Sequence, residues 1–137
     1  MIRTANWADE GAIAKCVSSA FDNFGEVTLI RQLAADGDKL IELVFEESGK
    51  VSGYVLVSKL RLQDAPQLYC GAIAPLAVHP DHQLRGIGSK LMREAIRASR
   101  GLGWTCFACW GTLVSIGILA FASRIYAATT ILSTFNI

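Results

Sequence analysis

Apolar residues recur along the first 110 positions with two spacings, which predict three helices and five strands. Apolar positions three and four apart predict helices at residues 8–21, 26–35 and 87–100. Runs rich in apolar and β-branched residues predict strands at residues 1–5, 40–47, 51–62, 67–78 and 104–110. The predicted order of elements is therefore β-α-α-β-β-β-α-β.

Two of the predicted strands indicate how the faces of a sheet are used. In residues 51–62, Val55 and Val57 lie on one face and Tyr54 and Leu56 on the other, because side chains alternate along a strand. A glycine within this strand, at position 53, allows a bulge. The strand 67–78 is almost entirely apolar after residue 69, which predicts burial on both faces. Tryptophan and phenylalanine residues stand in apolar runs and are expected in the core.

A glycine-rich turn joins the predicted strand 67–78 to the predicted helix 87–100. The first backbone N–H groups of a helix have no partner within the helix, so phosphate oxygens can accept hydrogen bonds from them. Gly86 and Gly88 lack the Cβ atoms that would hold a ligand away from the backbone. Arg85 and Lys90 add positive charge. This pattern favours an anion site over its alternative, a glycine-containing helix start without a ligand.

Residues 83–88, Gln-Leu-Arg-Gly-Ile-Gly, resemble the Q/R-x-x-G-x-G/A signature of the GNAT superfamily of N-acetyltransferases. The preceding Ala-Pro-Leu-Ala-Val-His-Pro-Asp-His is similar to the fourth strand of that family and its exit. The family often has glycine where Leu84 stands, a small departure because the contact is mainly made by the backbone. The resemblance implies that this loop binds the pyrophosphate of acetyl-CoA. The spacing does not match the G-x-G-x-x-G fingerprint of dinucleotide-binding proteins.

The resemblance extends over about residues 1–109, and within the superfamily the sequence is similar to the YhbS-like branch of predicted acetyltransferases. It rests on residues 26–33, on the Ala-Asp-Gly-Asp that follows, and on Gly-Leu-Gly-Trp at 101–104. It implies an α/β (α+β) fold with a mixed, centrally antiparallel sheet flanked by helices. It also implies a cofactor site in which backbone groups pair with the pantetheine arm and the loop holds the pyrophosphate. The residues implied are Leu76, Ala77 and Val78 for the arm, with Gln83, Leu84, Arg85, Gly86, Ile87, Gly88 and Ser89 in the loop.

The composition changes sharply after about residue 109. Residues 1–100 carry twelve of the thirteen Lys and Arg residues and all twelve acids, and Arg124 is the last charge. YhbS-like proteins have a G-[DHN]-P-x-Y-Y-x-R-x-G-F segment at this place, which the chain lacks. A shift of reading frame near residues 109–110 and a genuine apolar tail both explain this. We therefore expect a GNAT-like domain at 1–110 and an atypical tail at 111–137, which packs on the domain or on a partner chain and favours a homodimer.

Composition and charge exclude several classes of function. A net charge of +1 gives no general case for nucleic acid. The 23 uncharged residues 101–123 are long enough to span a bilayer, but their glycines and hydroxyl residues disfavour this. Four cysteines and an N-terminus without a signal-peptide pattern favour the cytoplasm. No metal site is predicted, because His79 and His82 lack neighbouring ligands and Cys106-x-x-Cys109 lacks a second pair.

The function implied by the resemblance is acetyl-CoA-dependent N-acetylation of a primary amine, on a small molecule or a protein, by direct attack. The general base is not evident, and Glu26 and Tyr69 are only weak candidates. The row Lys90, Arg93, Arg97 and Arg100 is interpreted as a solvated helix face, with contact to the 3′-phosphate of the cofactor as the alternative. Two other functions stay open because of the altered tail: an acyl-CoA-binding remnant with little or no catalysis, and a tail-anchored interaction protein.

Overall fold

The structure is a computed structural model that describes residues 1–61, 66, 69–102 and 106–109. The predicted order of helices and strands is confirmed, and the third helix has the predicted bounds. Residues 62, 67, 68, 104, 105 and 110 of the predicted strands, and the predicted tail 111–137, lie outside the described residues. The elements are β1 (Ile2–Thr4), the short 3₁₀-helix η1 (Trp7–Asp9), α1 (Glu10–Phe21), α2 (Gly25–Ala35), β2 (Lys39–Glu47), β3 (Lys50–Leu60), β4 (Cys70–Val78), the 3₁₀-helix η2 (Pro80–His82), α3 (Ile87–Arg100) and β5 (Cys106–Cys109).

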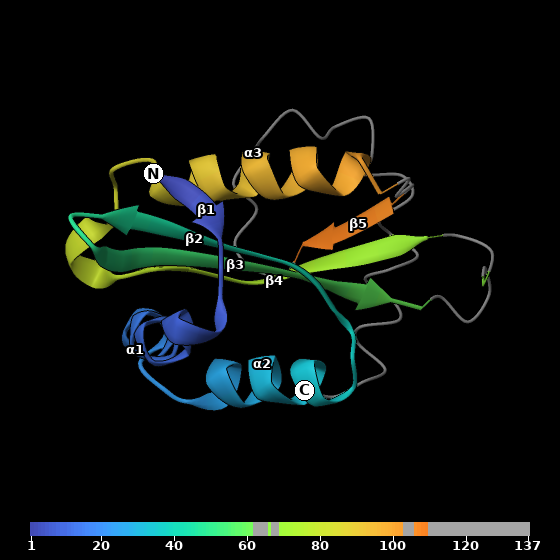
Figure 1. Cartoon of the computed structure of the whole chain (residues 1–137), viewed down its shortest axis with the longest axis horizontal. Coiled ribbons are helices and arrows are strands. Elements are labelled where there is room, and N and C mark those ends of the chain that lie inside the picture. Colours follow the sequence, from blue (N-terminus) through green and yellow to red (C-terminus); the bar gives the residue numbers. More distant parts are fainter. Residues whose placement is uncertain (62–65, 67–68, 103–105, 110–137) are drawn as a thin grey trace.

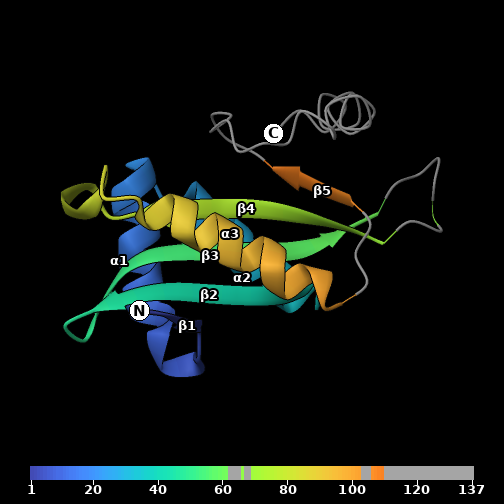
Figure 2. The ribbon, with the colours of Figure 1, turned by 90° about the horizontal axis from the view of Figure 1, so that it is seen from above.

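The five strands form one sheet in the order β1-β2-β3-β4-β5. The pairs from β1 to β4 are antiparallel, and β5 runs parallel to β4. Helices α1 and α2 cover one face of the sheet, and α3 covers the other (Figure 1). Seen from above, α3 lies across β2, β3 and β4 (Figure 2). The predicted mixed, centrally antiparallel sheet flanked by helices is therefore confirmed.

Short-range signals determine the two connections on either side of β2. Gly37 follows the last turn of α2 with φ +71°, a left-handed conformation that favours glycine and ends a helix. The β2–β3 hairpin turns through Ser48 and Gly49, whose φ angles are +52° and +73°. Two successive positive φ angles are typical of the tight turn whose twist matches that of paired strands. This turn fixes the position of Glu47, which pairs with Lys50 across the hairpin.

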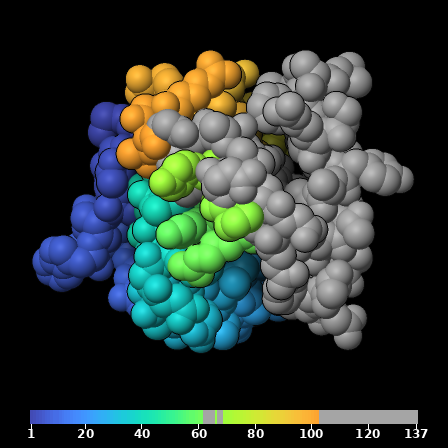
Figure 3. All heavy atoms as spheres, turned by 90° about the vertical axis from the view of Figure 1, so that its right-hand side faces the viewer, coloured from blue at the N-terminus to red at the C-terminus, as the bar shows by residue number. Residues whose placement is uncertain are grey.

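The apolar side chains form one cluster on each face of the sheet, as the alternation in β3 predicts. Tyr54 and Leu56 are fully buried against α1 and α2, whereas Val55 and Val57 are buried against α3. The α3 cluster takes residues four apart on that helix, Ile87, Leu91 and Ala95. The space-filling view from the end where β3 finishes shows the same layers, with α3 in orange above the green strands (Figure 3).

Gly53 brings β3 into close contact with the beginning of α3. A Cβ atom at this position would lie 2.8 Å from Leu91 Cδ1, 2.9 Å from Ile87 Cγ2 and 3.3 Å from Phe45 Cβ. The register between β2 and β3 shifts next to Gly53, which confirms the predicted bulge. The absence of a side chain therefore lets the first turn of α3 rest directly on the sheet.

Strand β4 is paired on both edges only in its first half. Residues Cys70–Ile73 pair with β5, and a register shift relative to β3 follows at Ala74-Pro75, whose peptide bond is cis. Within the described part of the chain, the edge of β4 that faces β5 has no strand partner beyond Ile73. As far as the described residues show, the second half of β4 therefore presents backbone groups on an edge without a strand partner, called the open edge below.

An ion-pair cluster joins β1 to the start of α1. The Arg3 guanidinium donates to both carboxylate oxygens of Asp9 at 2.7 and 2.8 Å and to Glu46 at 2.7 Å. Asp9 also accepts the Asn6 amide N–H at 2.8 Å. The hydrogen bonds from Arg3 and from the Asn6 backbone lower the pKa of Asp9 from 3.8 to about 2. Ionised Asp9 therefore stabilises the N-terminal corner of the fold.

Three aromatic residues contradict the expectation that tryptophan and phenylalanine lie in the core. Trp7 is 91% exposed in η1, Phe21 is 38% exposed at the end of α1, and Phe24 is 71% exposed immediately before α2. The apolar stretches around them bury other members, such as Val17 and Val27. Among the described residues, no helix combines the length and the apolar character that crossing a membrane requires.

Candidate functional site

The glycine-rich loop connects the open end of β4 to the first turn of α3. After Val78, the chain passes through η2 and then takes a left-handed conformation twice, at Leu84 with φ +60° and at Gly86 with φ +74°. Glycine adopts this conformation without strain, whereas a leucine side chain does not. This conformation explains why a glycine is favoured where the chain has Leu84, whose side chain is fully exposed.

Six consecutive backbone amides in this loop have no hydrogen-bond partner within the described part of the chain. They belong to residues 84–89, and the first bonded amide after them is that of Lys90, which donates to the Gly86 carbonyl at 3.1 Å. Gly86 has no atom within 4 Å of the place where a Cβ would stand, and at Gly88 the nearest atom is Val78 Cγ2 at 3.6 Å. The six amides are therefore available to donate to a ligand. Two of the six residues are glycines, so no side chain of their own shields these amides.

The open edge of β4 leads directly into this loop. The His79 amide donates to the Ser52 carbonyl of β3 at 2.9 Å. Because backbone groups of a strand point alternately to its two edges, Ala77 faces β3 while Leu76 and Val78 face the open edge. The Gln83 side chain donates to the Val78 carbonyl at 3.0 Å and so ties the start of the loop to the end of the strand.

Three charged or polar side chains from separate elements meet beside the loop. Arg85 Nη1 lies 3.4 Å from Glu47 Oε2, at the end of β2, and 3.0 Å from His82 Nδ1, in η2. His82 Nδ1 lies 3.7 Å from the same Glu47 oxygen. Sequence reasoning identified Arg85 but missed Glu47, because nothing in the sequence indicates a contact across 38 positions.

The two weak candidates for a general base stand apart from the loop residues. Tyr69 is exposed and immediately precedes β4, so the length of that strand separates it from the loop, about 30 Å for nine residues. Glu26 lies half-buried in the first turn of α2. Helix α2 covers the face of the sheet opposite α3 (Figure 1). The general base stays a prediction.

Cys16 is a buried thiol close to the end of β4. Burial raises its pKa to about 11, although a hydrogen bond with the His79 backbone acts in the opposite direction. A thiol with such a pKa is almost entirely protonated at neutral pH, which makes Cys16 a core residue rather than a nucleophile. Among the described residues, no three His, Cys, Asp or Glu side chains are grouped closely enough to hold a metal ion.

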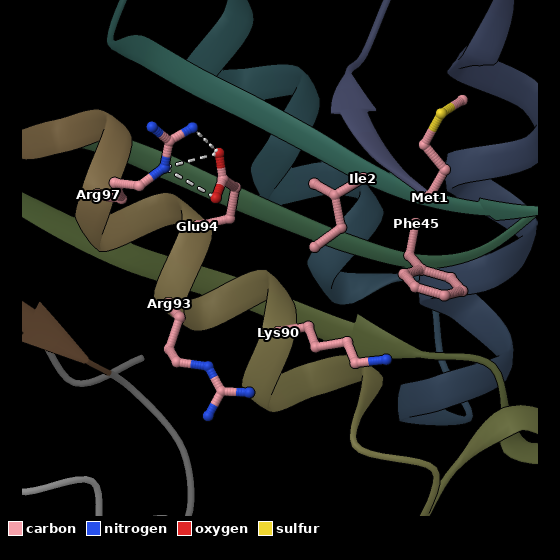
Figure 4. A pocket seen from close by; sticks show the side chains of 7 residues that line it. All are labelled: Met1, Ile2, Phe45, Lys90, Arg93, Glu94 and Arg97. Carbon is pink, nitrogen blue, oxygen red and sulfur yellow. Dashed lines mark hydrogen bonds and ion pairs between the residues drawn. The ribbon is translucent and has the colours of Figure 1, made fainter.

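The basic row of α3 borders an open groove of about 530 Å³ beside the β1 edge of the sheet. Met1, Ile2 and Phe45 form its apolar floor, and Lys90 and Arg93 extend along its helical side (Figure 4). Arg97 is held by Glu94 on the same helix. All four basic side chains of the row are exposed, which agrees with the interpretation of a solvated helix face. Contact of this row with the 3′-phosphate of the cofactor stays untested.

Comparison with known sequences connects this geometry to a family. A model of the acetyltransferase (GNAT) family matches residues 6–114. The tRNA(Met) cytidine acetyltransferase TmcA of Nitrosococcus halophilus (strain Nc4) is 34% identical over 86 residues, which cover 58% of this chain and 12% of TmcA. The chain therefore spans about an eighth of the length of this curated relative.

Comparison with solved structures identifies the same fold. A GNAT family acetyltransferase from Brucella melitensis, in complex with acetyl-CoA, has a TM-score of 0.78 and 28% identity, covering 88% of this chain and 80% of that one. YhbS from Escherichia coli, in complex with CoA, has a TM-score of 0.74 and 26% identity, covering 90% of this chain and 66% of that one. Both similar proteins thus contain the cofactor or its product.

Proposed function

The chain belongs to the acetyltransferase (GNAT) family, and from this premise we propose that it transfers an acetyl group from acetyl-CoA to a primary amine by direct attack. The observation that carries the proposal is the row of six amides at residues 84–89 that have no partner among the described residues and that follow shortly after the open edge of β4. The similarity to YhbS supports a place in the YhbS-like branch.

The open edge of β4 is the proposed place for the pantetheine arm. An extended molecule with amide groups can pair with a strand edge as an added strand does. Leu76 and Val78 supply the backbone groups that face this edge, while Ala77 holds the strand to β3. Because Gln83 already donates to the Val78 carbonyl, we expect the Val78 amide and both groups of Leu76 to make the contacts.

The loop is the proposed place for the diphosphate. Amides of Leu84, Arg85, Gly86, Ile87, Gly88 and Ser89 can donate to its oxygens without losing any bond to the described part of the chain. The positive end of α3 adds to the attraction. Removing six unbonded donors from water would be costly without an acceptor. A bound anion would therefore accept the hydrogen bonds that water accepts in its absence.

Transfer of an acetyl group from a thioester to an amine requires the protein mainly to hold these two reactants together. Positioning an amine against a thioester can supply much of the rate acceleration, and a backbone N–H near the carbonyl stabilises the charge that develops there. The bound acetyl-CoA supplies an activated acyl group and a thiolate leaving group. The amine must lose one proton, through a base or through water, and Glu26 and Tyr69 remain weak candidates for the former.

A CoA-release assay with a panel of amines tests the proposal. We expect acetyl-CoA to raise the melting temperature and a subset of small-molecule or peptide amines to release free thiol. Stabilisation without release from any amine would favour the acyl-CoA-binding remnant. Absence of both effects would refute the cofactor site itself. Gly88→Val is the matched variant, because it adds a side chain beside the amides, and it should abolish stabilisation by acetyl-CoA.

The acceptor, oligomeric state and location remain proposals. The acceptor of TmcA is not transferred to this chain, which spans a small part of that protein. We propose an amine of a small molecule or protein as acceptor, a cytoplasmic location and a homodimer formed through the tail. Size-exclusion chromatography with light scattering tests the last of these, and a monomer at working concentration would contradict it.

A further inference from the structure

Glu47 is the one acid within ion-pair distance of Arg85 among the described residues, and nothing in the family signature assigns it a role. It stands at the last position of β2, where the tight hairpin turn and its pairing with Lys50 fix its backbone. The carboxylate therefore stays within side-chain reach of the loop in any state that keeps the hairpin. A negative group at this place is unexpected next to amides that would receive a diphosphate.

Both partners of this pair are half-exposed: 52% of the Arg85 side chain and 45% of that of Glu47 are accessible. An ion pair in such a position is weak and exchanges readily, because solvent screens it. A diphosphate bound to the amides of residues 84–89 would offer Arg85 a second anion that carries more charge. One guanidinium would then have two competing acceptors on neighbouring sites.

We propose that Glu47 competes with the diphosphate of CoA for Arg85, and so weakens cofactor binding and assists release of product CoA. The inference rests on the proposed function, since it assumes that the loop binds this diphosphate. In the free protein, Arg85 is held by Glu47 and His82. On binding, Arg85 turns toward the diphosphate, and Glu47 is left as an unpaired negative charge close to it. The loss of the Arg85–Glu47 ion pair and the repulsion between Glu47 and the diphosphate both lower affinity.

Calorimetric titration of CoA into a double-mutant cycle tests the competition. Glu47→Gln removes the charge while keeping the size of the side chain, and we expect it to tighten CoA binding roughly two- to fivefold, the range that loss of one exposed charge pair corresponds to. Arg85→Gln should weaken binding. In the Arg85→Gln background, Glu47→Gln should tighten binding by a smaller factor, because only the repulsion of the diphosphate remains to be removed and there is no arginine to be released.

Several results would overturn the inference. Weaker binding by Glu47→Gln would make Glu47 a residue that orients Arg85. Equal tightening with and without Arg85 would reduce its role to general repulsion. The control is Glu10→Gln, an exposed residue of α1 that changes the net charge equally, and its affinity should match that of the wild type. If the wild type does not bind CoA, the proposed function is overturned as well. If the wild type binds CoA and Glu47→Gln leaves the affinity unchanged, only this inference is overturned.

Discussion

Substituting alanine for Gly53 tests the close packing between β3 and α3. The added Cβ would lie 2.8 Å from Leu91 Cδ1 and 2.9 Å from Ile87 Cγ2, well inside normal contact distance. Leu91 can move the end of its flexible side chain. The Ile87 methyl group is fixed directly to the first residue of α3, so that residue must shift, while Phe45 Cβ at 3.3 Å blocks movement toward β2. Overpacking of this kind costs about 1–3 kcal/mol.

The measurement is urea unfolding followed by circular dichroism, with CoA titration on the same samples. We expect Gly53→Ala to lower the free energy of unfolding by about 2 kcal/mol, and CoA affinity to fall because the amides of the first α3 turn move with Ile87. Gly11→Ala is the matched control: nothing lies within 4 Å of its Cβ position in α1, so it should gain about 0.5–1 kcal/mol as a helix substitution. Equal stability of Gly53→Ala and the wild type would refute the packing argument.

Three further predictions concern single residues. Asp9→Asn should lower the melting temperature at pH 7; because the pKa of Asp9 falls from 3.8 to about 2 on folding, its stabilisation is present above pH 4 and lost toward pH 2, where variant and wild type should converge. Gly86→Ala should cost about 1 kcal/mol from the left-handed φ of +74° alone and also weaken CoA binding; unchanged unfolding would contradict it. Cys16, whose pKa is raised to about 11 by burial, should resist alkylation at pH 8 until the protein is denatured, as peptide mass spectrometry can follow.

Local patterns in the sequence were sufficient for most of the fold. Alternation along β3 correctly assigned Tyr54 and Val55 to opposite faces, because that strand is buried on both and a shift of one residue would invert it. The bounds of α3 were predicted from apolar residues four apart and from glycine at each end. The positions of these elements depend on residues only a few positions apart, so they can be predicted from the sequence alone.

What sequence reasoning missed depends on contacts between distant segments. The exposure of Trp7 and Phe24 follows from where η1 and α2 dock, which an apolar neighbourhood in the sequence does not specify. Likewise, Glu47 meets Arg85 only because the β2–β3 hairpin returns to the loop. The role of Gly53 was predicted as a bulge, but its second role, admitting α3, required the helix position. The loop of the candidate site was recognisable from its local pattern, whereas its binding role and its catalytic groups stay predictions.

The half-paired β4 has a consequence for self-association. An exposed strand edge with a full row of donors and acceptors is a template on which another copy can aggregate. Here that row is short and incomplete within the described part of the chain: pairing with β5 ends at Ile73, and Gln83 occupies the Val78 carbonyl. The edge keeps only a few scattered partners, which suit a short flexible molecule and offer little to a complete foreign strand.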